Sequence, residues 1–487
     1  MTPFSYLSAY GNWIVGVVLF AAALTSVYAV VRENGNPTKT LTWVLLIVMF
    51  PVVGILLYIN FGLNYRRRKL YHIKKTKDID YYNQLIEEEY YNFDAQKWMD
   101  IPEVRGKKDV AKLLLKSSKS LFSITNDVKV LQDGPDTFEA LFEALEKAEK
   151  FIHIQYYIFE EGQLADRFLE ILTRKIQEGV DVRLLYDSVG SFSLSRQFRE
   201  KMTAAGIQHS RFLPVRFVQL ANKINYRNHR KIVIIDCKVG FTGGINVSDK
   251  YLTGDHLGPW RDTFIRIEGN AVNGLQFLFL TDWYFASNQQ LLYRKFFYQH
   301  ENKGQTTPVQ IVGSGPDSDY AGVMHQYSRI INVARDYVFI QNPYLIPGEI
   351  IQNDLITTAL SGVDVRIMIP GVSDFKIVKW SSNSYLEDLL KAGVRIFRYQ
   401  DGFLHSKVIL SDDEICSVGT GNMDIRSFEL NFEVNALVFD QGTTQELKDR
   451  FMKDCEKCVE VTLEEFQNRP YSQKILESFS RLISPVL

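Results

Sequence analysis

The chain of 487 residues is 46% hydrophobic and 23% charged, and its 56 Lys and Arg residues nearly balance 57 Asp and Glu residues. This composition excludes wholesale disorder, and a general nucleic-acid-binding protein would carry a basic excess that this chain lacks. Four cysteines are too few for a disulfide framework and are typical of a reducing compartment.

Two long apolar segments stand near the start of the sequence. Residues 13–31 and residues 41–63 contain no charged side chain, and a helix needs roughly 20 apolar residues to cross a bilayer. We therefore expect a transmembrane hairpin over residues 1–64, with helices at about 13–31 and 41–63. A cleaved signal peptide is the alternative for the first segment, but no basic region precedes it and a second apolar segment follows it.

Positive charge predicts how this hairpin is oriented. The nine residues that join the two segments contain Arg32 and Lys39, whereas residues 66–77 contain seven Lys or Arg residues. Because positively charged loops stay on the cytoplasmic side, we expect a multi-pass protein of the cell membrane whose residues after 64 lie in the cytoplasm. The segment 65–108 is then a basic juxtamembrane linker, which could also hold anionic lipid headgroups near the protein.

The remainder of the sequence contains one unit twice. The tripeptide Gly-Pro-Asp stands at 134–136 and at 315–317, and Gly-Val-Asp-Val-Arg stands at 179–183 and at 362–366. Ile-Gln and Ala-Gly pairs recur in the same order, and all offsets lie between 181 and 187. Such ordered matches indicate an internal repeat, which predicts a first lobe at 109–300 and a second lobe at 301–487.

Each copy alternates helical and strand-like segments. In the first copy, helical apolar spacing over 138–150 precedes a β-rich run at 151–159, and a second helical segment at 164–178 precedes a buried strand at 180–186. Such alternation predicts sheets with helices packed on their faces. We expect an α/β fold of two similar α/β/α lobes related by a pseudo-twofold axis, where a shared site would receive the same residues from both lobes.

The later part of each copy holds a polar motif with identical internal spacing. The pattern H-x-K-x4-D, followed by a turn of small residues and an Asn, occurs in NHRKIVIIDCKVGFTGGIN and in LHSKVILSDDEICSVGTGN. The two occurrences align without a gap at an offset of 176. Their polar residues are His229, Lys231, Asp236 and Asn246 in the first copy and His405, Lys407, Asp412 and Asn422 in the second.

These residue types suit a phosphodiester that undergoes displacement. Residues i and i+2 of a strand face the same side, so the His and the Lys of each copy project together. One His could attack phosphorus and the other protonate the leaving oxygen, while the Lys and Asn side chains stabilise charge on the phosphate oxygens. A metal site is the alternative for His with Asp, but the Lys beside each His would repel a cation. Asp236 and Asp412 have the opposite strand parity, and we interpret them as supports within their lobes.

The paired motifs resemble the HKD signature of the phospholipase D superfamily, and the resemblance covers nearly the whole chain. The N-terminal hairpin, the basic segment after it and the sequence RLISPVL at 481–487 resemble the bacterial cardiolipin synthases in particular. This resemblance implies that two phosphatidylglycerol molecules are converted to cardiolipin and glycerol through a phosphohistidine intermediate, with no metal and no cofactor. It also implies phosphatidylglycerol, other anionic phospholipids and the bilayer as partners, and no nucleic acid.

The resemblance further implies a role for each residue of the two motifs. His229 would be the nucleophile and His405 the general acid and later the base, although the reverse assignment stays open. Asn246 and Asn422 would hold phosphate together with the two lysines, and Thr420 would add a hydroxyl contact where the first copy has Gly244. The catalytic set of the family signature is His229, Lys231, Asp236, His405, Lys407 and Asp412.

Two carboxylates outside the motifs complete the predicted site. A neutral nucleophilic imidazole needs a carboxylate on its other ring nitrogen. Asp262, in the sequence WRD, and Glu433, in the sequence NFE, stand at suitable places downstream of the two motifs. Surface ion pairs are the alternative role for both residues.

Other functions remain open for such a sequence. The same site could pass the phosphatidyl group to water, as a phospholipase D, or to serine, as a phosphatidylserine synthase. A nuclease of the same fold would require a basic groove. A membrane scaffold with relic motifs would have lost at least one of the paired His, Lys or Asn residues, and all six are present.

The C-terminal segment has an apolar stripe at helical spacing. Ile475, Phe479, Leu482 and Ile483 would share one face of a helix. We expect this face to pack on the lobe that carries it rather than on the bilayer.

Overall fold

The computed structural model describes residues 3–32, 37–58, 101, 104, 106–214, 226–289, 291, 293–298 and 307–484. The chain divides into an N-terminal helical unit and a larger α/β unit, which are described separately below. The predicted basic residues at 66–77 and the end of the second apolar segment at 59–63 lie outside the described residues.

The N-terminal unit contains three described helices, α1 (Pro3–Arg32), α2 (Pro37–Met49) and α3 (Pro51–Leu57). Among the described residues, only the part of α1 at Trp13–Arg32 is long and apolar enough to cross a membrane. Val30, Ile47 and Tyr58 form a small buried cluster that joins the helices. The structure thus contains one apolar helix of the kind that anchors a protein in a bilayer.

The second apolar segment is not one continuous helix, so the expectation of a single helix over 41–63 is wrong within the described residues. The helix breaks at Phe50 (φ −135°, ψ 73°), because the following Pro51 disfavours the helical conformation in the residue before it. Helix α3 then packs against α2, and a Cβ atom on Gly54 would lie 2.6 Å from the carbonyl oxygen of Leu46. With lengths of roughly 20 Å and 10 Å, neither α2 nor α3 covers a hydrocarbon core of about 30 Å.

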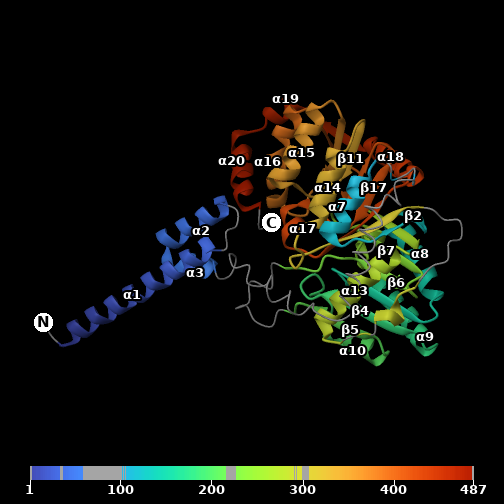
Figure 1. Cartoon of the computed structure of the whole chain (residues 1–487), viewed down its shortest axis with the longest axis horizontal. Coiled ribbons are helices and arrows are strands. Elements are labelled where there is room, and N and C mark those ends of the chain that lie inside the picture. Colours follow the sequence, from blue (N-terminus) through green and yellow to red (C-terminus); the bar gives the residue numbers. More distant parts are fainter. Residues whose placement is uncertain are drawn as a thin grey trace. The chain divides into compact units, whose positions relative to one another are not determined.

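The first half of the α/β unit is built on a seven-stranded sheet with the order β2-β9-β7-β6-β3-β4-β5. Figure 1 labels β2, β4, β5, β6 and β7 of this sheet. Its strands are β2 (Asn126–Gln132), β3 (Phe151–Tyr156), β4 (Asp181–Asp187), β5 (Gln208–Phe212), β6 (Ile232–Ile235), β7 (Val239–Gly243) and β9 (Thr263–Gly269). Its helices are α8 (Asp133–Glu146), α9 (Gln163–Gln177), α10 (Arg196–Ala204), α12 (Lys250–Thr253) and α13 (Val272–Ser287).

The second half is built on a nine-stranded sheet with the order β1-β10-β19-β17-β16-β11-β13-β14-β20. Its strands are β1 (Phe122–Ser123), β10 (Val309–Ser314), β11 (Tyr337–Gln341), β13 (Asp364–Pro370), β14 (Arg395–Tyr399), β16 (Val408–Ser411), β17 (Ile415–Gly419), β19 (Glu433–Val438) and β20 (Cys458–Val461). Its helices are α7 (Lys108–Ser118), α14 (Gly322–Asn332), α15 (Gly348–Leu360), α16 (Lys376–Lys391), α17 (Ile425–Glu429), α18 (Gln441–Cys455), α19 (Leu463–Gln467) and α20 (Tyr471–Ile483).

The two sheets share one strand order, which confirms the predicted duplication. When the edge strands β1 and β20 are set aside, the second sheet repeats the first strand by strand in the order of the chain. In each half three neighbouring strands are parallel (β3, β4 and β5, then β11, β13 and β14), and the others are antiparallel. The fold is therefore α/β with two similar mixed sheets.

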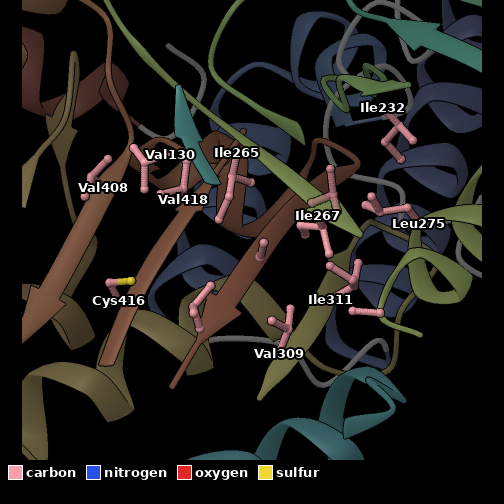
Figure 2. Packing of buried hydrophobic residues seen from close by; sticks show 14 of the residues in the cluster. Val130, Ile232, Ile265, Ile267, Leu275, Val309, Ile311, Val408, Cys416 and Val418 are labelled. Atoms are coloured by element: carbon pink, nitrogen blue, oxygen red, sulfur yellow. The ribbon is translucent and has the colours of Figure 1, made fainter. Parts of the chain in front are cut away.

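A shared apolar core joins the two halves. Figure 2 shows side chains of one buried cluster that come from both sheets, including Ile265 and Ile267 of β9, Val309 of β10 and Val418 of β17. Two further clusters lie on the outer faces, one beneath α8 and α9 and one beneath α14, α15 and α16. Because the sheets meet through their inner faces, strand ends from both halves come together at the interface.

The segment before the first sheet packs with the second half. Val110, Leu114 and Phe122 belong to the buried cluster of the second half, and β1 pairs with β10. The predicted first lobe at 109–300 therefore begins with a segment that completes the second half. Its helix α7 contacts α14 because its apolar stripe is buried there.

Helix α20 has the opposite orientation to the one predicted. Phe479 is 66% exposed and Leu482 is 75% exposed, whereas Glu477 is 1% exposed. Glu477 accepts hydrogen bonds from Asn383 of α16 at 3.1 Å and from Arg469 at 2.7 Å. Polar groups thus attach α20 to its lobe, and the apolar stripe faces outward.

Candidate active site

The two H-x-K sequences lie at equivalent strand ends. His229 and Lys231 precede β6, which runs antiparallel to β3, and His405 and Lys407 precede β16, which runs antiparallel to β11. Each pair therefore lies at the edge of its sheet where the parallel strands have their carboxyl ends. Side chains at this edge of an α/β sheet commonly form binding and catalytic sites.

The backbone of each motif is hydrogen-bonded to the opposite half of the molecule. The amide of His229 donates to the carbonyl of Phe432 at 2.9 Å, and the amide of His405 donates to the carbonyl of Arg261 at 2.8 Å. The second contact extends a parallel ladder between β8 (Trp260–Arg261) and β15 (Phe403–Leu404). These reciprocal contacts hold the two histidines at the interface between the halves.

The two carboxylates predicted from the sequence lie on the imidazoles, in a crossed arrangement. Nδ1 of His229 lies 2.9 Å from Oε2 of Glu433, and Nδ1 of His405 lies 2.7 Å from Oδ2 of Asp262. Each histidine is thus oriented by a carboxylate from the opposite half. A carboxylate at Nδ1 favours a proton on that nitrogen and leaves Nε2 of the neutral ring with its lone pair.

Both histidines are neutral at neutral pH. Burial lowers the pKa of His229 to about 4, although Glu433 opposes the shift. Burial, followed by the Lys407 ammonium, lowers the pKa of His405 well below its usual value. Neutral imidazoles can act as nucleophiles or bases, and one of them must acquire a proton before it can serve as an acid.

Both lysines of the motifs are buried beside their histidines. Nζ of Lys231 donates to the carbonyl of His229 at 2.8 Å and lies 5.3 Å from the centre of the Tyr157 ring. Nζ of Lys407 donates to the carbonyl of His405 and lies 2.9 Å from Nδ1 of the same residue. Burial lowers the pKa of both lysines, that of Lys407 to about 8.

The two predicted phosphate-binding asparagines differ in their contacts. Oδ1 of Asn246 accepts from the amide of Ile158 at 3.1 Å, and its Nδ2 donates to the Tyr251 hydroxyl at 3.2 Å. Oδ1 of Asn422 is buried and has no hydrogen-bond partner in the part of the chain that the structure describes. The side-chain oxygen of Asn422 therefore has acceptor capacity left, which suits a ligand hydroxyl.

Thr420 contacts a carboxylate instead of facing an open site. Its hydroxyl donates to Oε2 of Glu433 at 2.5 Å and accepts from the amide of Val434 at 2.9 Å. The predicted hydroxyl contact with phosphate is therefore not supported by this geometry. At the equivalent position of the first copy, a Cβ atom on Gly244 would lie 2.1 Å from Oδ1 of Asp262.

The two orienting carboxylates have pKa values shifted in opposite directions. Burial raises the pKa of Asp262 to about 7, because Lys407 and the amide of Thr263 offset the loss of solvation only in part. Burial also opposes ionisation of Glu433, but His229, Lys231 and the Thr420 hydroxyl together lower its pKa. Glu433 is thus a fixed anion, whereas Asp262 titrates near neutral pH.

The two motif aspartates make their hydrogen bonds away from the imidazoles. Asp236 accepts from the amides of residues 149, 150 and 151 at 2.8 Å each, at the start of β3. Asp412 accepts from the amides of residues 335, 336 and 337 at the start of β11, and from Nζ of Lys107 at 2.8 Å. Both aspartates thus hold the backbone at the start of a strand, which agrees with their interpretation as supports within the lobes.

Further polar groups beneath the site were not assigned from the sequence. Oδ2 of Asp282 accepts from Nε2 of Gln155 and from Arg230, the residue between His229 and Lys231. In the second half, Oδ2 of Asp454 accepts from Nε2 of Gln341 and from Arg261, the residue before Asp262. The repeated Ile-Gln pairs of the sequence were the available signal, because Gln155 and Gln341 are their second members.

Three aromatic residues that the sequence did not single out also contact the histidines. The Tyr157 ring lies 4.8 Å from the ring of His229, and the Trp260 ring lies 5.3 Å from the ring of His405. The Tyr251 hydroxyl lies 3.2 Å from Nδ1 of His405. These rings exclude water from the imidazoles and so contribute to their lowered pKa values.

A duplicated α/β fold with paired histidines and lysines at the interface defines a phospholipase D-like protein. The family profile described as "Cardiolipin synthase, PLD-like domain" matches residues 141–257 and 327–455, and the profile "Phospholipase_D-nuclease N-terminal" matches residues 17–62. The chain belongs to the cardiolipin synthase family.

Curated relatives match over nearly their full length. A cardiolipin synthase of Oceanobacillus iheyensis is 40% identical over 481 residues, which cover 97% of this chain and 99% of the relative. A cardiolipin synthase of Clostridium perfringens is 40% identical and covers 93% of this chain and 95% of the relative. Among solved structures, phosphatidylserine synthase of Haemophilus influenzae has a TM-score of 0.59 at 15% identity, with 78% of this chain and 100% of that chain covered, and this likeness supports the fold alone.

Proposed function

We propose that this protein is a cardiolipin synthase that transfers a phosphatidyl group from one phosphatidylglycerol to a glycerol hydroxyl of another. The observation that carries the proposal is the crossed arrangement at the interface, in which each buried histidine is paired with a carboxylate from the opposite half. Two histidines with two buried lysines match the requirements of displacement at phosphorus through a covalent intermediate. Relatives named cardiolipin synthase at 40% identity support the choice of lipid.

The reaction has two steps. Nε2 of one histidine attacks phosphorus, the bond between phosphorus and the glycerol oxygen breaks, and the second histidine donates its proton to that oxygen. The hydroxyl of the second phosphatidylglycerol then gives its proton to the second histidine and attacks phosphorus, which breaks the bond to nitrogen. Lys231, Lys407, Asn246 and Asn422 stabilise charge on the phosphate oxygens.

The inequality of the carboxylates favours His229 as the nucleophile. With Glu433 ionised and the pKa of His229 at about 4, this pair is a neutral imidazole next to a fixed anion. The pair of Asp262 and His405 instead binds a proton near pH 7, and coupled groups share such a proton. His405 is therefore the member that can receive a proton from its pair and act as the acid.

An activated substrate tests this assignment. Phosphatidyl-p-nitrophenol releases a leaving group that needs no acid, so His405→Ala should give a burst of nitrophenolate and a labelled phosphoenzyme. His229→Ala should give neither. The converse pattern, with a burst in His229→Ala alone, would reverse the two roles.

Product analysis tests the acceptor. Protein in mixed micelles with phosphatidylglycerol as the only lipid should yield cardiolipin and glycerol in equal amounts. Phosphatidic acid as the sole product would make the protein a hydrolase, and product formed only after serine is added would make it a phosphatidylserine synthase.

We also propose a multi-pass topology with the α/β unit in the cytoplasm. The seven Lys and Arg residues at 66–77, against two in the segment between the apolar segments, support this orientation. The second apolar segment would then enter the bilayer as the broken helix pair α2 and α3. A membrane-impermeant thiol reagent should label Gly35→Cys in intact cells and Arg68→Cys only after lysis.

A further inference from the structure

Two exposed phenylalanines occupy equivalent places in the two halves of the α/β unit. Strands β4 and β13 are related by an offset of 183, and the loop after each strand contains Val-x-x-Phe at that same offset. The phenylalanines are Phe192, which is 85% exposed, and Phe375, which is 63% exposed. Neither ring packs in a core, so the fold does not require a large apolar side chain at either position.

Both loops lie at the sheet edge that carries the active site. Strand β4 is parallel to β3 and β13 is parallel to β11, so the loops that follow them leave the same edges as the two H-x-K sequences. A scattered exposed Phe would need no explanation, but each ring of this pair follows a strand that only one other strand, β3 or β11, separates from the strand after an H-x-K sequence.

Contacts tie each loop to the site. In the first half, the Ser191 hydroxyl, next to Phe192, donates to the carbonyl of Tyr157, whose ring lies 4.8 Å from His229. In the second half, Asp374, next to Phe375, accepts from the Tyr344 hydroxyl at 2.5 Å. Burial lowers the pKa of Lys407 to about 8, and Asp374 is one of four carboxylates whose charges oppose this shift. The polar neighbour of each Phe thus points inward, while the ring points to solvent.

The surface around Phe375 in the second half has side chains that fit an anionic bilayer. Val372 and Ile377 are also exposed beside Phe375, and the exposed Lys376 adds a positive charge next to them. Apolar rings inserted at the level of the headgroups with cations beside them are the usual means by which a protein surface binds anionic lipid.

We propose that Phe192 and Phe375 insert into the bilayer on the two sides of the active site and admit one phosphatidylglycerol on each side. The proposal rests on the proposed function, since a reaction between two lipids needs both headgroups at one site without removal of the acyl chains from the membrane. The anchor α1 keeps the protein at the membrane, whereas the two phenylalanines would turn the site toward it.

The experiment compares two forms of one substrate. Wild type, Phe192→Ala, Phe375→Ala and the double variant are assayed on phosphatidylglycerol vesicles and on dihexanoyl phosphatidylglycerol below its micellar concentration. The double variant should lose at least about 10-fold in kcat/KM on vesicles, since each buried Phe contributes enough for a tenfold effect, and should stay within about twofold on the dispersed lipid. Conservative Phe→Leu changes at both positions should restore most of the vesicle activity.

Leu360→Ala is the matched control. Leu360 is 69% exposed but ends α15 ahead of β13, at the opposite edge of the sheet, and its variant should behave as wild type on both substrates. An independent experiment measures the tryptophan fluorescence of Phe192→Trp and Phe375→Trp with vesicles of brominated phosphatidylglycerol. The quenching in each variant is taken as the difference from wild type. Quenching at 192 and 375 but not in Leu360→Trp supports insertion.

Two outcomes would overturn the proposal. Unchanged vesicle activity in the double variant, or equal losses on both substrates, would show that the phenylalanines do not act through the bilayer. Failure of wild type to make cardiolipin from either substrate would instead refute the proposed function, and the quenching arm would still report on insertion.

Discussion

Oδ2 of Asp262 lies 2.7 Å from Nδ1 of His405, although 143 positions separate the two residues and they come from opposite halves of the molecule. Glu433 has the same relation to His229 in the other direction. Each of these two histidines therefore takes its carboxylate from the other half. A displacement of the two sheets would separate both pairs at once, so the activity depends directly on the packed interface in Figure 2.

The crossed pairing predicts the effect of removing one carboxylate charge. Asp262→Asn keeps the size of the side chain but loses the carboxylate that orients His405 and shares a proton with it. We therefore expect kcat to fall by about 10²- to 10⁴-fold. A double-mutant cycle should couple Asp262→Asn to His405→Ala, so that the double variant is little worse than His405→Ala alone. The cycle between Glu433→Gln and His405→Ala should be close to additive, and strong coupling there would contradict the crossed arrangement.

The sequence was sufficient for the duplication and for the chemical groups of the site. The repeated pentapeptide and the H-x-K-x4-D motif are local signals, and their copies lie at equivalent places in two sheets with one strand order. Asp262 and Glu433 were also found, because a nucleophilic imidazole requires a carboxylate. Which carboxylate serves which histidine depends on packing between halves, and no local pattern contains that information.

Two expectations are wrong for different physical reasons: helical spacing does not specify which face of a helix is covered, and a proline restricts the residue before it. Spacing alone predicts that the apolar stripe of α20 packs on its lobe, yet the buried Glu477 and its partner Arg469 hold the opposite face of the helix. The uncharged segment predicts a single helix over 41–63, but in the structure Pro51 begins a second helix after a break at Phe50.

Gly244 predicts an effect of a single methyl group. The Cβ atom of Gly244→Ala would lie 2.1 Å from Oδ1 of Asp262, so the carboxylate must move away from His405. We expect kcat to fall by roughly 10²-fold, since a misplaced catalytic group of this kind costs about that factor, with vesicle binding unchanged. Gly442→Ala in α18 is the control, because its Cβ atom would meet only Oδ2 of Asp440, at 3.3 Å. Normal activity in Gly244→Ala would mean that Asp262 does not need its observed position.

Asp454 predicts a loss of stability at the interface. It lies beneath the site and accepts from Arg261 at 3.0 Å and from Gln341 at 2.8 Å, and Asp454→Ala would leave the buried guanidinium with a weaker counter-charge. Removal of one member of a buried ion pair lowers the free energy of unfolding by about 3 kcal/mol. Pulse proteolysis in urea measures this change. Glu143→Ala, which breaks the exposed pair with Lys147, should leave the urea midpoint unchanged, and an equal shift in both variants would rule out a special role for burial.

Lys407 predicts the alkaline side of the pH profile. Burial lowers its pKa to about 8, so the ammonium is present below that pH and is lost as the pH rises through it. With phosphatidyl-p-nitrophenol, which needs no acid, kcat/KM should fall about tenfold per pH unit above this pKa, because the uncharged amine no longer stabilises the phosphate oxygens. Lys407→Arg should have a lower maximum but no such fall, since a guanidinium stays protonated in this range. Lys448→Arg, whose lysine pairs with Asp413 away from the histidines, should keep the wild-type profile. A fall that persists in Lys407→Arg and disappears in Lys231→Arg would assign the titration to Lys231 and contradict the prediction.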